Sequence, residues 1–297
     1  MHPLLRKILL SSAIPVFPAL LLCFCCTQKP AQADAVATNA LPYDLENPSL
    51  TINLVSEGLK EVSGICATNV PGEYLAIADE RGEIFFVDGA RGGAISRTVL
   101  FREKGDFEDV QMVGDNIWAI KSDGKLFEVS DWKNTPPKVA EYKTPLKKRD
   151  DIEGLSYDPA RNALLLACKG DPDSAYLRNI FAFDLKTKQL DAKAQYAIDP
   201  NEVNRLVPYS ETEKHDFFSP SGVAIHPKTG DVYVISAALK RMVVLDKASG
   251  KILFANRLDK KILPQPEGIA FDRDGNLHLS SEGKKGEGLL IKFNYKK

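Results

Sequence analysis

Acidic and hydroxyl side chains recur at two related sets of positions along this chain, and together they could hold a metal ion. The first set consists of Ser63, Glu108, Glu153, Ser221 and Glu267. The second set lies two residues earlier and consists of Glu61, Asp106, Asp151, Ser219 and Gln265. Residues two apart on an extended strand point to the same side, so both sets can face one mouth if their strands converge.

Crowded carboxylates dictate the chemistry of such a mouth. In a partly desolvated channel, their mutual repulsion must be relieved by protonation or by a bound cation. Carboxylate, hydroxyl and amide oxygens suit a hard ion, and a wide, irregular ring suits calcium better than magnesium. These residue types therefore predict a calcium ion at the mouth. The alternative is structural: the acids would cap strand entries and accept hydrogen bonds from backbone amides, with water filling the pore.

A phrase repeated five times places these residues in equivalent positions. It consists of a small or acidic residue, usually a glycine, an apolar residue, any residue, and mostly a second apolar residue, as in Glu153-Gly154-Leu155-Ser156-Tyr157. Its five copies begin 45, 45, 68 and 46 residues apart. A period of roughly 40 to 50 residues is typical of β-propeller blades. The first strand of each blade lines the central channel, so the phrase predicts the channel wall.

Each copy is followed by further short β-rich runs, such as residues 74–78 and 83–87 after the first copy. Such runs, with turns about every 8 to 12 residues, predict antiparallel sheet. The last copy lacks a fourth run, while residues 50–55 form an unpartnered one, which we expect to complete the last blade as its outer strand. The sequence thus predicts an all-β, five-bladed propeller of four-stranded antiparallel blades, closed without open sheet edges.

The interval of 68 residues leaves a sixth blade as the alternative. Residues 199–218 contain two prolines and lack a second set of strand patterns. They favour a long loop between blades three and four, with a helical turn at residues 202–206. His215 beside Asp216 in this loop is a weak candidate for a base. Because no serine or cysteine nucleophile motif accompanies it, no catalytic residue is predicted.

Residues 1–26 differ in kind from the rest of the chain. Two basic residues precede an apolar stretch that ends in three cysteines, as in a bacterial lipoprotein signal. Cys26 is the predicted lipidation site, with Cys23 and Cys25 as alternatives. This pattern predicts a membrane-anchored lipoprotein of the bacterial cell envelope. Cleavage after Ala33 would instead give a soluble periplasmic protein, and a retained apolar stretch would be a membrane anchor.

Residues 27–48, rich in Ala, Gln, Asn and Pro, are then a predicted flexible tether, and residues 49–297 form the propeller domain. Cys66 and Cys168 fall in strands of different blades and are expected to be buried free thiols. The 39 basic and 40 acidic residues are interspersed, so the chain shows no sign of a nucleic-acid-binding surface. We expect a monomer.

Stretches such as Ala78-Asp79-Glu80-Arg81-Gly82-Glu83-Ile84 and Pro266-Glu267-Gly268-Ile269-Ala270 carry a wider resemblance. In their order, over residues 50–297, they resemble the SdiA-regulated-domain family of bacterial envelope proteins. The resemblance implies a five-bladed propeller, distantly similar to NHL-repeat propellers, with a calcium site. Carried onto this chain, the implied ligands are Glu108, Glu153 and Glu267, with Glu61 and Asp151 as further ligands. The second copy departs from the phrase at Asp109, where glycine is expected.

Two functions fit these features. The first is a binding module without enzyme activity, in which calcium rigidifies the channel mouth. Hairpins between the second and third strands, such as Asp79-Glu80-Arg81 and Lys169-Gly170-Asp171, open on the same face and would recognise a protein or a glycan. The alternative is a calcium-dependent hydrolase of the lactonase or esterase type, by analogy with calcium-bearing propellers. The shortage of a convincing base favours the binding module.

Overall fold

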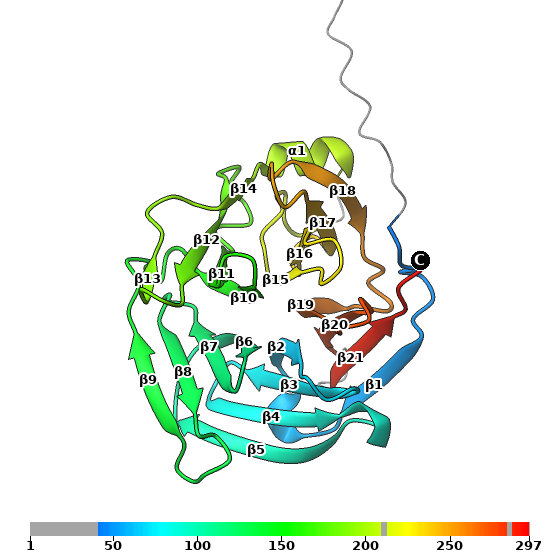
Figure 1. The fold of residues 1–297 in the computed structure, drawn as a ribbon. Coiled ribbons are helices and arrows are strands. Elements are labelled where there is room, and N and C mark those ends of the chain that lie inside the picture. Colours follow the sequence, from blue (N-terminus) through cyan, green and yellow to red (C-terminus); the bar gives the residue numbers. More distant parts are fainter. Residues whose placement is uncertain (1–40, 209–212, 284–286, 297) are drawn as a thin grey trace, which may run out of the picture. The chain divides into compact units, whose positions relative to one another are not determined.

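Five antiparallel sheets surround a central axis in the computed structural model, which describes residues 41–208, 213–283 and 287–296. Figure 1 shows the sheets as the blades of a propeller, with the first strand of each blade nearest the axis. Within each of the first four blades the strands pair in chain order. The predicted all-β, five-bladed propeller is therefore confirmed.

The blades consist of the following strands. The first contains β2 (Val62–Ala67), β3 (Glu73–Ala78), β4 (Gly82–Asp88) and β5 (Ala94–Arg102). The second contains β6 (Phe107–Val113), β7 (Asn116–Lys121), β8 (Leu126–Ser130) and β9 (Lys138–Tyr142). The third contains β10 (Ile152–Asp158), β11 (Ala163–Cys168), β12 (Arg178–Asp184) and, sharing the outer position, β13 (Gln189–Leu190) and β14 (Tyr196–Ile198). The fourth contains β15 (Gly222–Ile225), β16 (Val232–Ser236), β17 (Arg241–Leu245) and β18 (Ile252–Arg257).

The fifth blade closes the ring by joining the two ends of the propeller. It contains β19 (Gln265–Phe271), β20 (Leu277–Glu282), β21 (Gly288–Phe293) and, as its outer strand, β1 (Leu50–Leu54). The pairing of β1 with β21 runs from Leu50 opposite Lys292 to Leu54 opposite Gly288. The predicted closure by an N-terminal strand is confirmed, and it covers a sheet edge that would otherwise be open.

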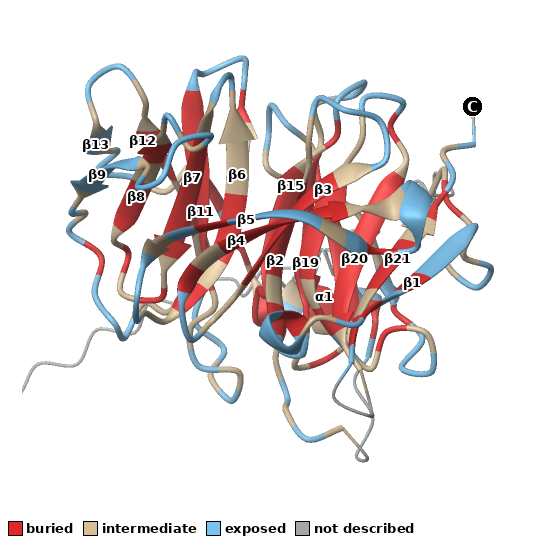
Figure 2. Ribbon diagram, turned by 90° about the horizontal axis from the view of Figure 1, so that it is seen from below, coloured by how far each residue is buried: buried red, intermediate tan, exposed pale blue. Residues whose placement is uncertain are grey.

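The hydrophobic core lies between neighbouring blades. Each of five clusters of buried side chains joins two adjacent blades, as Leu165 of β11 and Val234 of β16 do in one of them. Figure 2 shows the burial concentrated on the inner and middle strands, with outer strands such as β5 and β9 largely exposed. A fully buried aliphatic side chain of this kind contributes about 1.5 to 3 kcal/mol. Cys66 and Cys168 are buried free thiols, as predicted.

The glycine at the second position of the repeated phrase allows neighbouring inner strands to approach closely. A Cβ atom added to Gly154 would lie 2.8 Å from the backbone nitrogen of Val223 in the next blade. Asp109 holds the equivalent position in β6, and its buried carboxylate accepts a hydrogen bond from the backbone of Leu155 at 2.7 Å. The departure from the phrase therefore replaces a close backbone approach with a side-chain link between blades two and three.

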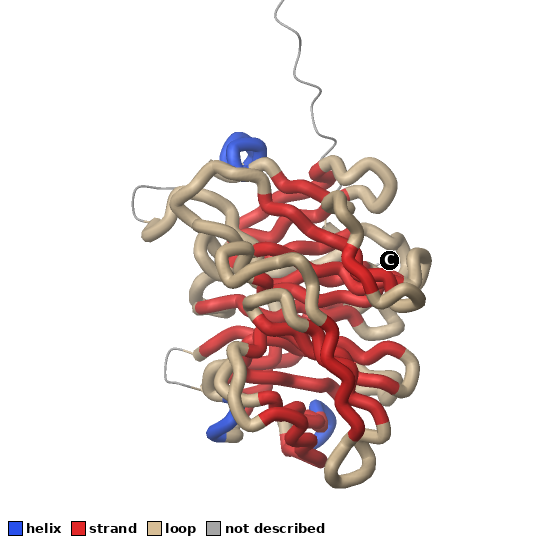
Figure 3. The backbone as a smooth tube through the Cα atoms, turned by 90° about the vertical axis from the view of Figure 1, so that its left-hand side faces the viewer, coloured by secondary structure: helices blue, strands red, loops and turns tan. Residues whose placement is uncertain are grey.

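The extra residues of the long interval follow β14 and, where the structure describes them, form a loop with one helix, α1 (Pro200–Leu206). Asp199 caps it by accepting a hydrogen bond from the backbone of Asn201. No sixth blade occurs in the described residues, so the predicted loop with a helical turn is confirmed. Two short 3-10 helices, Glu57–Leu59 and Gly89–Arg91, complete the secondary structure. Figure 3 shows the helices at the margin of the strands.

Residues 41–48, the last part of the predicted tether, lie among the described residues. Tyr43 is buried in the core cluster of the last two blades, and its hydroxyl donates a hydrogen bond to the Gly275 carbonyl at 2.7 Å. The predicted signal peptide (residues 1–26), Cys26 and Ala33 lie outside the described residues. Within the described ranges, every helix is too short or too polar to cross a membrane.

Candidate functional site

Backbone bulges at the start of the inner strands set the first residue of the phrase apart from the regular ladder. The pairing register skips Ser63 in β2, Glu108 in β6 and Glu153 in β10. A fourth irregularity, in β19, spans Glu267. A bulge bends the strand locally and re-aims a side chain. These residues consequently face a common cavity at the channel mouth.

This cavity, the acid cavity, has a volume of about 250 Å³. Its lining residues are Glu61, Ser63, Asp79, Glu108, Glu153, Lys169, Ser221, Gln265, Glu267 and Glu282. All five residues of the first predicted set therefore meet at one end of the channel. The hairpin residues Asp79, Lys169 and Glu282 join them, which places the predicted loop face beside the acids.

The second predicted set is only partly present in the acid cavity, where Glu61 and Gln265 are its members. Asp106 instead accepts a hydrogen bond from the Ser122 hydroxyl, and Ser219 donates one to the Lys169 carbonyl at 2.6 Å. Asp151 does not line the cavity and has a left-handed backbone conformation with φ of 50°. The expectation that both sets would face the mouth is therefore met in full by the first set and only in part by the second.

Among the described residues that line the acid cavity, Lys169 supplies the one positive charge. Its Nζ atom lies 2.6 Å from a carboxylate oxygen of the buried Glu153. Burial alone would lower the pKa of this ammonium, but Glu153, Asp151 and Glu267 more than offset that effect and raise the pKa above its usual value. Lys169 is thus a fixed cation in the middle of a group of acids.

One ammonium does not neutralise the surrounding carboxyls. Burial, reinforced by the negative charge of Glu153, raises the pKa of Glu108 to about 9 and that of Glu267 to about 8. Burial raises the pKa of Glu153 itself to about 7, against the opposing influence of Lys169. Glu108 and Glu267 therefore retain protons near neutral pH, and Glu153 titrates there, unless a further cation enters the cavity.

The donor atoms of the acid cavity suit calcium, although their present spacing does not yet form a site. Carboxylates, the Gln265 amide and the hydroxyls of Ser63 and Ser221 are all oxygen ligands of the type calcium prefers. Among the described residues, no three His, Cys, Asp or Glu side chains are grouped closely enough to hold a metal ion. The residues fit the ion by chemistry, and binding requires their side chains to move closer together.

The histidine in the long loop lies away from this chemistry. Nδ1 of His215 is 3.1 Å from a carboxylate oxygen of Asp173, and His215 does not line the acid cavity. The candidate base considered from the sequence is thus not brought to the acids. The group placed closest to a proton-transfer role is Glu153, whose pKa of about 7 follows from its burial.

The fold and the acid cavity together define a five-bladed β-propeller with a carboxylate-lined channel mouth. The sequence matches the family described as SdiA-regulated over residues 45–285, and the chain belongs to that family. None of the curated proteins matches its sequence.

Several solved structures are similar to this chain. Glutaminyl cyclase from Myxococcus xanthus is similar with 11% identity and a TM-score of 0.52, over 84% of this chain and 95% of that chain. A chain of a nidogen/laminin complex matches with 14% identity and a TM-score of 0.48, over 74% of this chain and 72% of that chain. A luciferin-regenerating enzyme matches with 13% identity and a TM-score of 0.48, over 78% and 77% respectively. The match to glutaminyl cyclase, at this low identity, shows a common fold only.

The sequence places Lys169 in a hairpin on the face of the channel mouth but does not directly predict its ion pair with Glu153. A signal was available, because the hairpin position that follows the second strand holds Asp79 in the first blade, Lys169 in the third and Glu282 in the fifth. Lys169 is the basic residue among these equivalent hairpin positions, and it faces the acids at the start of the inner strands. A basic residue at one set of equivalent positions and acids at the other together indicate the ion pair between Lys169 and Glu153.

Proposed function

We propose that this protein is a calcium-binding module of the bacterial cell envelope, in which an ion at the channel mouth organises a loop face that recognises a protein partner. The observation that carries this proposal is the charge imbalance of the acid cavity. Six carboxylic acids and a single ammonium line it in the part of the chain that the structure describes. A divalent cation would favour the ionised forms of Glu108, Glu153 and Glu267, whose pKa values are raised by burial and by neighbouring acids.

Glu108, Glu153 and Glu267 are the proposed ligands, and Glu61, which also lines the cavity, is a further one. Asp151 adds negative charge from outside the lining. Because Lys169 already holds Glu153 at 2.6 Å, calcium and the ammonium compete for one carboxylate. Binding of the ion is therefore coupled to the position of Lys169 and of the hairpin that carries it.

Thermal unfolding across a calcium titration tests the site. A ligand that binds only the folded protein stabilises it by about 2.7 kcal/mol at a hundredfold excess over Kd. We expect calcium to raise the melting temperature, and Glu153→Gln or Glu267→Gln to abolish the rise. Glu103, whose exposed side chain pairs with Arg81 outside the cavity, provides the control Glu103→Gln, which should keep the full response.

A melting temperature that calcium does not change would reject the proposed ion. In that case the two cavity variants should be neutral or stabilising, since each removes a buried carboxyl from a crowded group. The acids would then be structural, with water in the pore.

The proposed partner surface is the loop between β11 and β12, which begins at Lys169. Its Tyr176 and Leu177 side chains are 82% and 55% exposed. Exposed aromatic and apolar side chains of this kind are typical of a protein contact surface. Envelope extracts passed over the immobilised protein, with calcium or with EGTA, test this idea. Capture that survives the paired substitution of Tyr176→Ser and Leu177→Ser would contradict it.

Attachment to the envelope membrane is proposed from the apolar residues 1–26 and the cysteines at their end. Lipid labelling of the wild-type chain and of Cys26→Ser distinguishes the possibilities. Label that is lost in the variant supports acylation at Cys26. A soluble periplasmic product that starts after Ala33 would overturn the anchor.

A hydrolase is the second candidate, because Glu153 has a pKa that burial raises to about 7 in a solvent-accessible cavity. A carboxyl with such a pKa can exchange protons at neutral pH. A panel of lactones and p-nitrophenyl esters tests this candidate. Calcium-dependent turnover that Glu153→Gln abolishes, with the fold intact, would favour the hydrolase over the binding module.

A further inference from the structure

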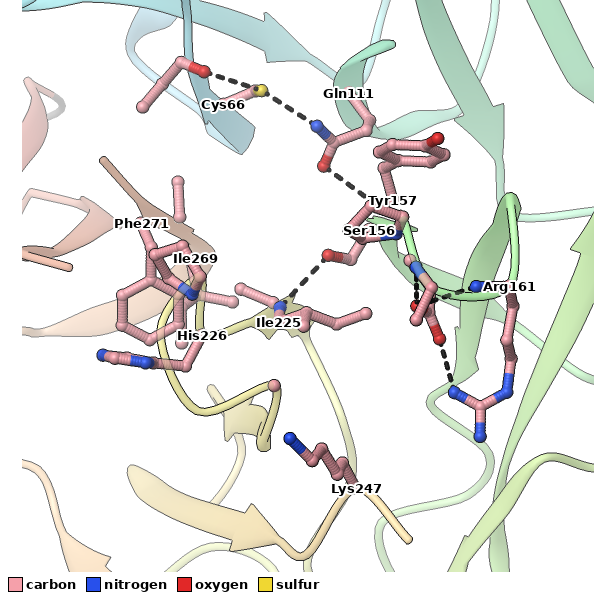
Figure 4. Close-up of a pocket in the computed structure, with 18 of the residues that line it drawn as sticks. Cys66, Gln111, Ser156, Tyr157, Arg161, Ile225, His226, Lys247, Ile269 and Phe271 are labelled. Carbon is pink, nitrogen blue, oxygen red and sulfur yellow. Dashed lines mark hydrogen bonds and ion pairs between the residues drawn. The ribbon is translucent and has the colours of Figure 1, made fainter. Parts of the chain in front are cut away.

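The end of the channel opposite the acid cavity holds a second and larger hollow, the opposite pocket, with a volume of about 730 Å³ (Figure 4). It is lined by the last residues of the inner strands, such as Ala67 of β2, where Ser63 of the same strand lines the acid cavity. At about 3.3 Å per residue, the two hollows lie roughly 10 Å or more apart along the strand. They are separate sites.

The wall of the opposite pocket is built from a ring of links between blades. The fourth residue of the phrase accepts a hydrogen bond from the backbone nitrogen of the fifth residue in the next blade. Cys66 accepts from Met112 at 3.4 Å, and Gln111 accepts from Tyr157 at 3.3 Å. Ser156 accepts from Ile225, also at 3.3 Å. Figure 4 shows the last two links across the pocket wall.

Two of the five links are missing because alanine replaces the acceptor. Ala224 and Ala270 hold the fourth position in the last two copies, so they offer nothing to the backbone nitrogens of Phe271 and Ala67. Within the described ranges no side chain accepts from either nitrogen. The nitrogen of the next residue, Asp272, donates to the carbonyl of Asn276, just before β20. Backbone donors alternate in direction along an antiparallel strand. The Phe271 nitrogen therefore faces away from β20, toward the channel.

The open donors lie beside an apolar surface. Ile225, Ile269 and Phe271 line the opposite pocket together with Ala224 and Ala270. Ligand sites of this volume are typically apolar, with a few polar groups that fix orientation. Two backbone N–H groups without a side-chain acceptor supply such polar groups, and donors without a protein partner favour a ligand that carries an acceptor.

Lys247 adds a positive charge at the rim. Its ammonium donates to the Thr229 carbonyl, but it forms no ion pair with any described residue. The other rim cation, Arg161, is neutralised by Asp158 at 2.6 Å. Figure 4 shows Lys247 reaching up toward the middle of the pocket. The rim therefore carries a net positive charge over an apolar floor.

We propose that the opposite pocket binds a small amphipathic carboxylate, whose apolar body rests on Ile225, Ile269 and Phe271. The carboxylate would accept from the open backbone donors of Phe271 in β19 and Ala67 in β2 and would pair with Lys247. This site shares no lining residue with the acid cavity, so the proposal does not depend on whether the acid cavity binds calcium.

Calorimetric titration of the purified full chain with sodium decanoate tests the proposal, with decanol as the uncharged comparison. Decanoate should bind about tenfold more tightly than decanol, the factor typical of one charge-assisted hydrogen bond. Lys247→Gln should remove that difference. Lys251→Gln, an exposed lysine in the same turn, should preserve it.

Ala224→Ser provides a second variant that does not depend on charge. The new hydroxyl supplies the missing acceptor, as Ser156 does in the third blade, and so occupies the Phe271 nitrogen. The melting temperature should stay the same or rise, while the affinity for decanoate falls several-fold. The proposal is overturned if decanoate does not bind, if it binds no better than decanol, or if both variants bind it as the wild type does.

Discussion

The ammonium of Lys169 lies 2.6 Å from the carboxylate of Glu153, so this propeller carries its own cation among the acids of the channel mouth. The pair joins a hairpin of the third blade to the inner strand of the same blade. Because the same carboxylate is a proposed calcium ligand, the pair makes occupancy of the mouth and the position of the hairpin interdependent. A loop face that responds to an ion needs a coupling of this kind.

Replacing Lys169 separates its two effects. Lys169→Met leaves Glu153 without its counterion, and we expect the calcium-free protein to lose about 1 to 3 kcal/mol of unfolding free energy. Calcium should bind the variant more tightly, since no ammonium competes for the carboxylate. Urea unfolding with EGTA and with calcium measures both effects.

The matched control for that experiment is Lys138→Met, which removes an exposed lysine paired with Asp131 at 2.7 Å. Exposed pairs contribute less than about 1 kcal/mol, and this variant should respond to calcium as the wild type does. Weaker calcium binding in Lys169→Met would show that the lysine assists the ion and does not compete with it.

The calcium-free protein should become less stable as the pH rises from about 5 to about 9. In the folded protein burial raises the pKa of Glu153, Glu267 and Glu108 to about 7, 8 and 9. In the unfolded chain these groups titrate near their ordinary value of about 4.3. The folded state therefore binds more protons across this window, and unfolding free energy falls as those protons are lost.

Urea unfolding with EGTA at several pH values measures this slope, and Glu267→Gln should flatten it while Glu103→Gln should not. The other charged groups lining the cavity with these three acids are Glu61, Asp79, Lys169 and Glu282. A stability that rises over the same window would mean that the three acids are ionised and well solvated.

Close approach of the inner strands makes Gly154 sensitive to substitution. A Cβ atom there would lie 2.8 Å from the Val223 nitrogen, so Gly154→Ala should cost about 1 to 3 kcal/mol through overpacking. Gly72 is the comparison, because it has open space around it but a φ of 78°. Gly72→Ala should cost about 1 kcal/mol from backbone strain alone. Equal losses in urea unfolding would rule out the steric effect.

Tyr43 anchors the segment before the first strand. Tyr43→Phe removes the hydrogen bond to the Gly275 carbonyl and should cost about 1 kcal/mol. Tyr43→Ala also removes a buried ring and should cost about 3 to 5 kcal/mol, as measured by chemical unfolding. If Tyr43→Ala leaves the unfolding free energy unchanged, residues 41–48 would belong to the flexible tether predicted from the sequence.

The number of blades, the channel-lining strands and the first set of site residues were all predictable from the chain itself. Each copy of the phrase occupies the same place in its blade, so a fixed period along the sequence becomes a ring of equivalent residues in space. Ser63, Glu153 and Glu267 meet in one cavity for this reason. The closing strand was predictable too, because β1 was the one β-rich run without a blade of its own.

The tertiary structure alone decided which of these residues the site uses. Bulges, which depend on the packing of neighbouring inner strands, turn Glu108 and Glu153 toward the axis, whereas Asp106 bonds to Ser122. Contacts between chain segments also decide two other features. The placement of Lys169 among the acids depends on contact between a hairpin and an inner strand, and the open donors beside Ala224 depend on contact between different blades. A repeat pattern records what each blade has in common, while ion pairs and missing links arise where one blade differs from the next.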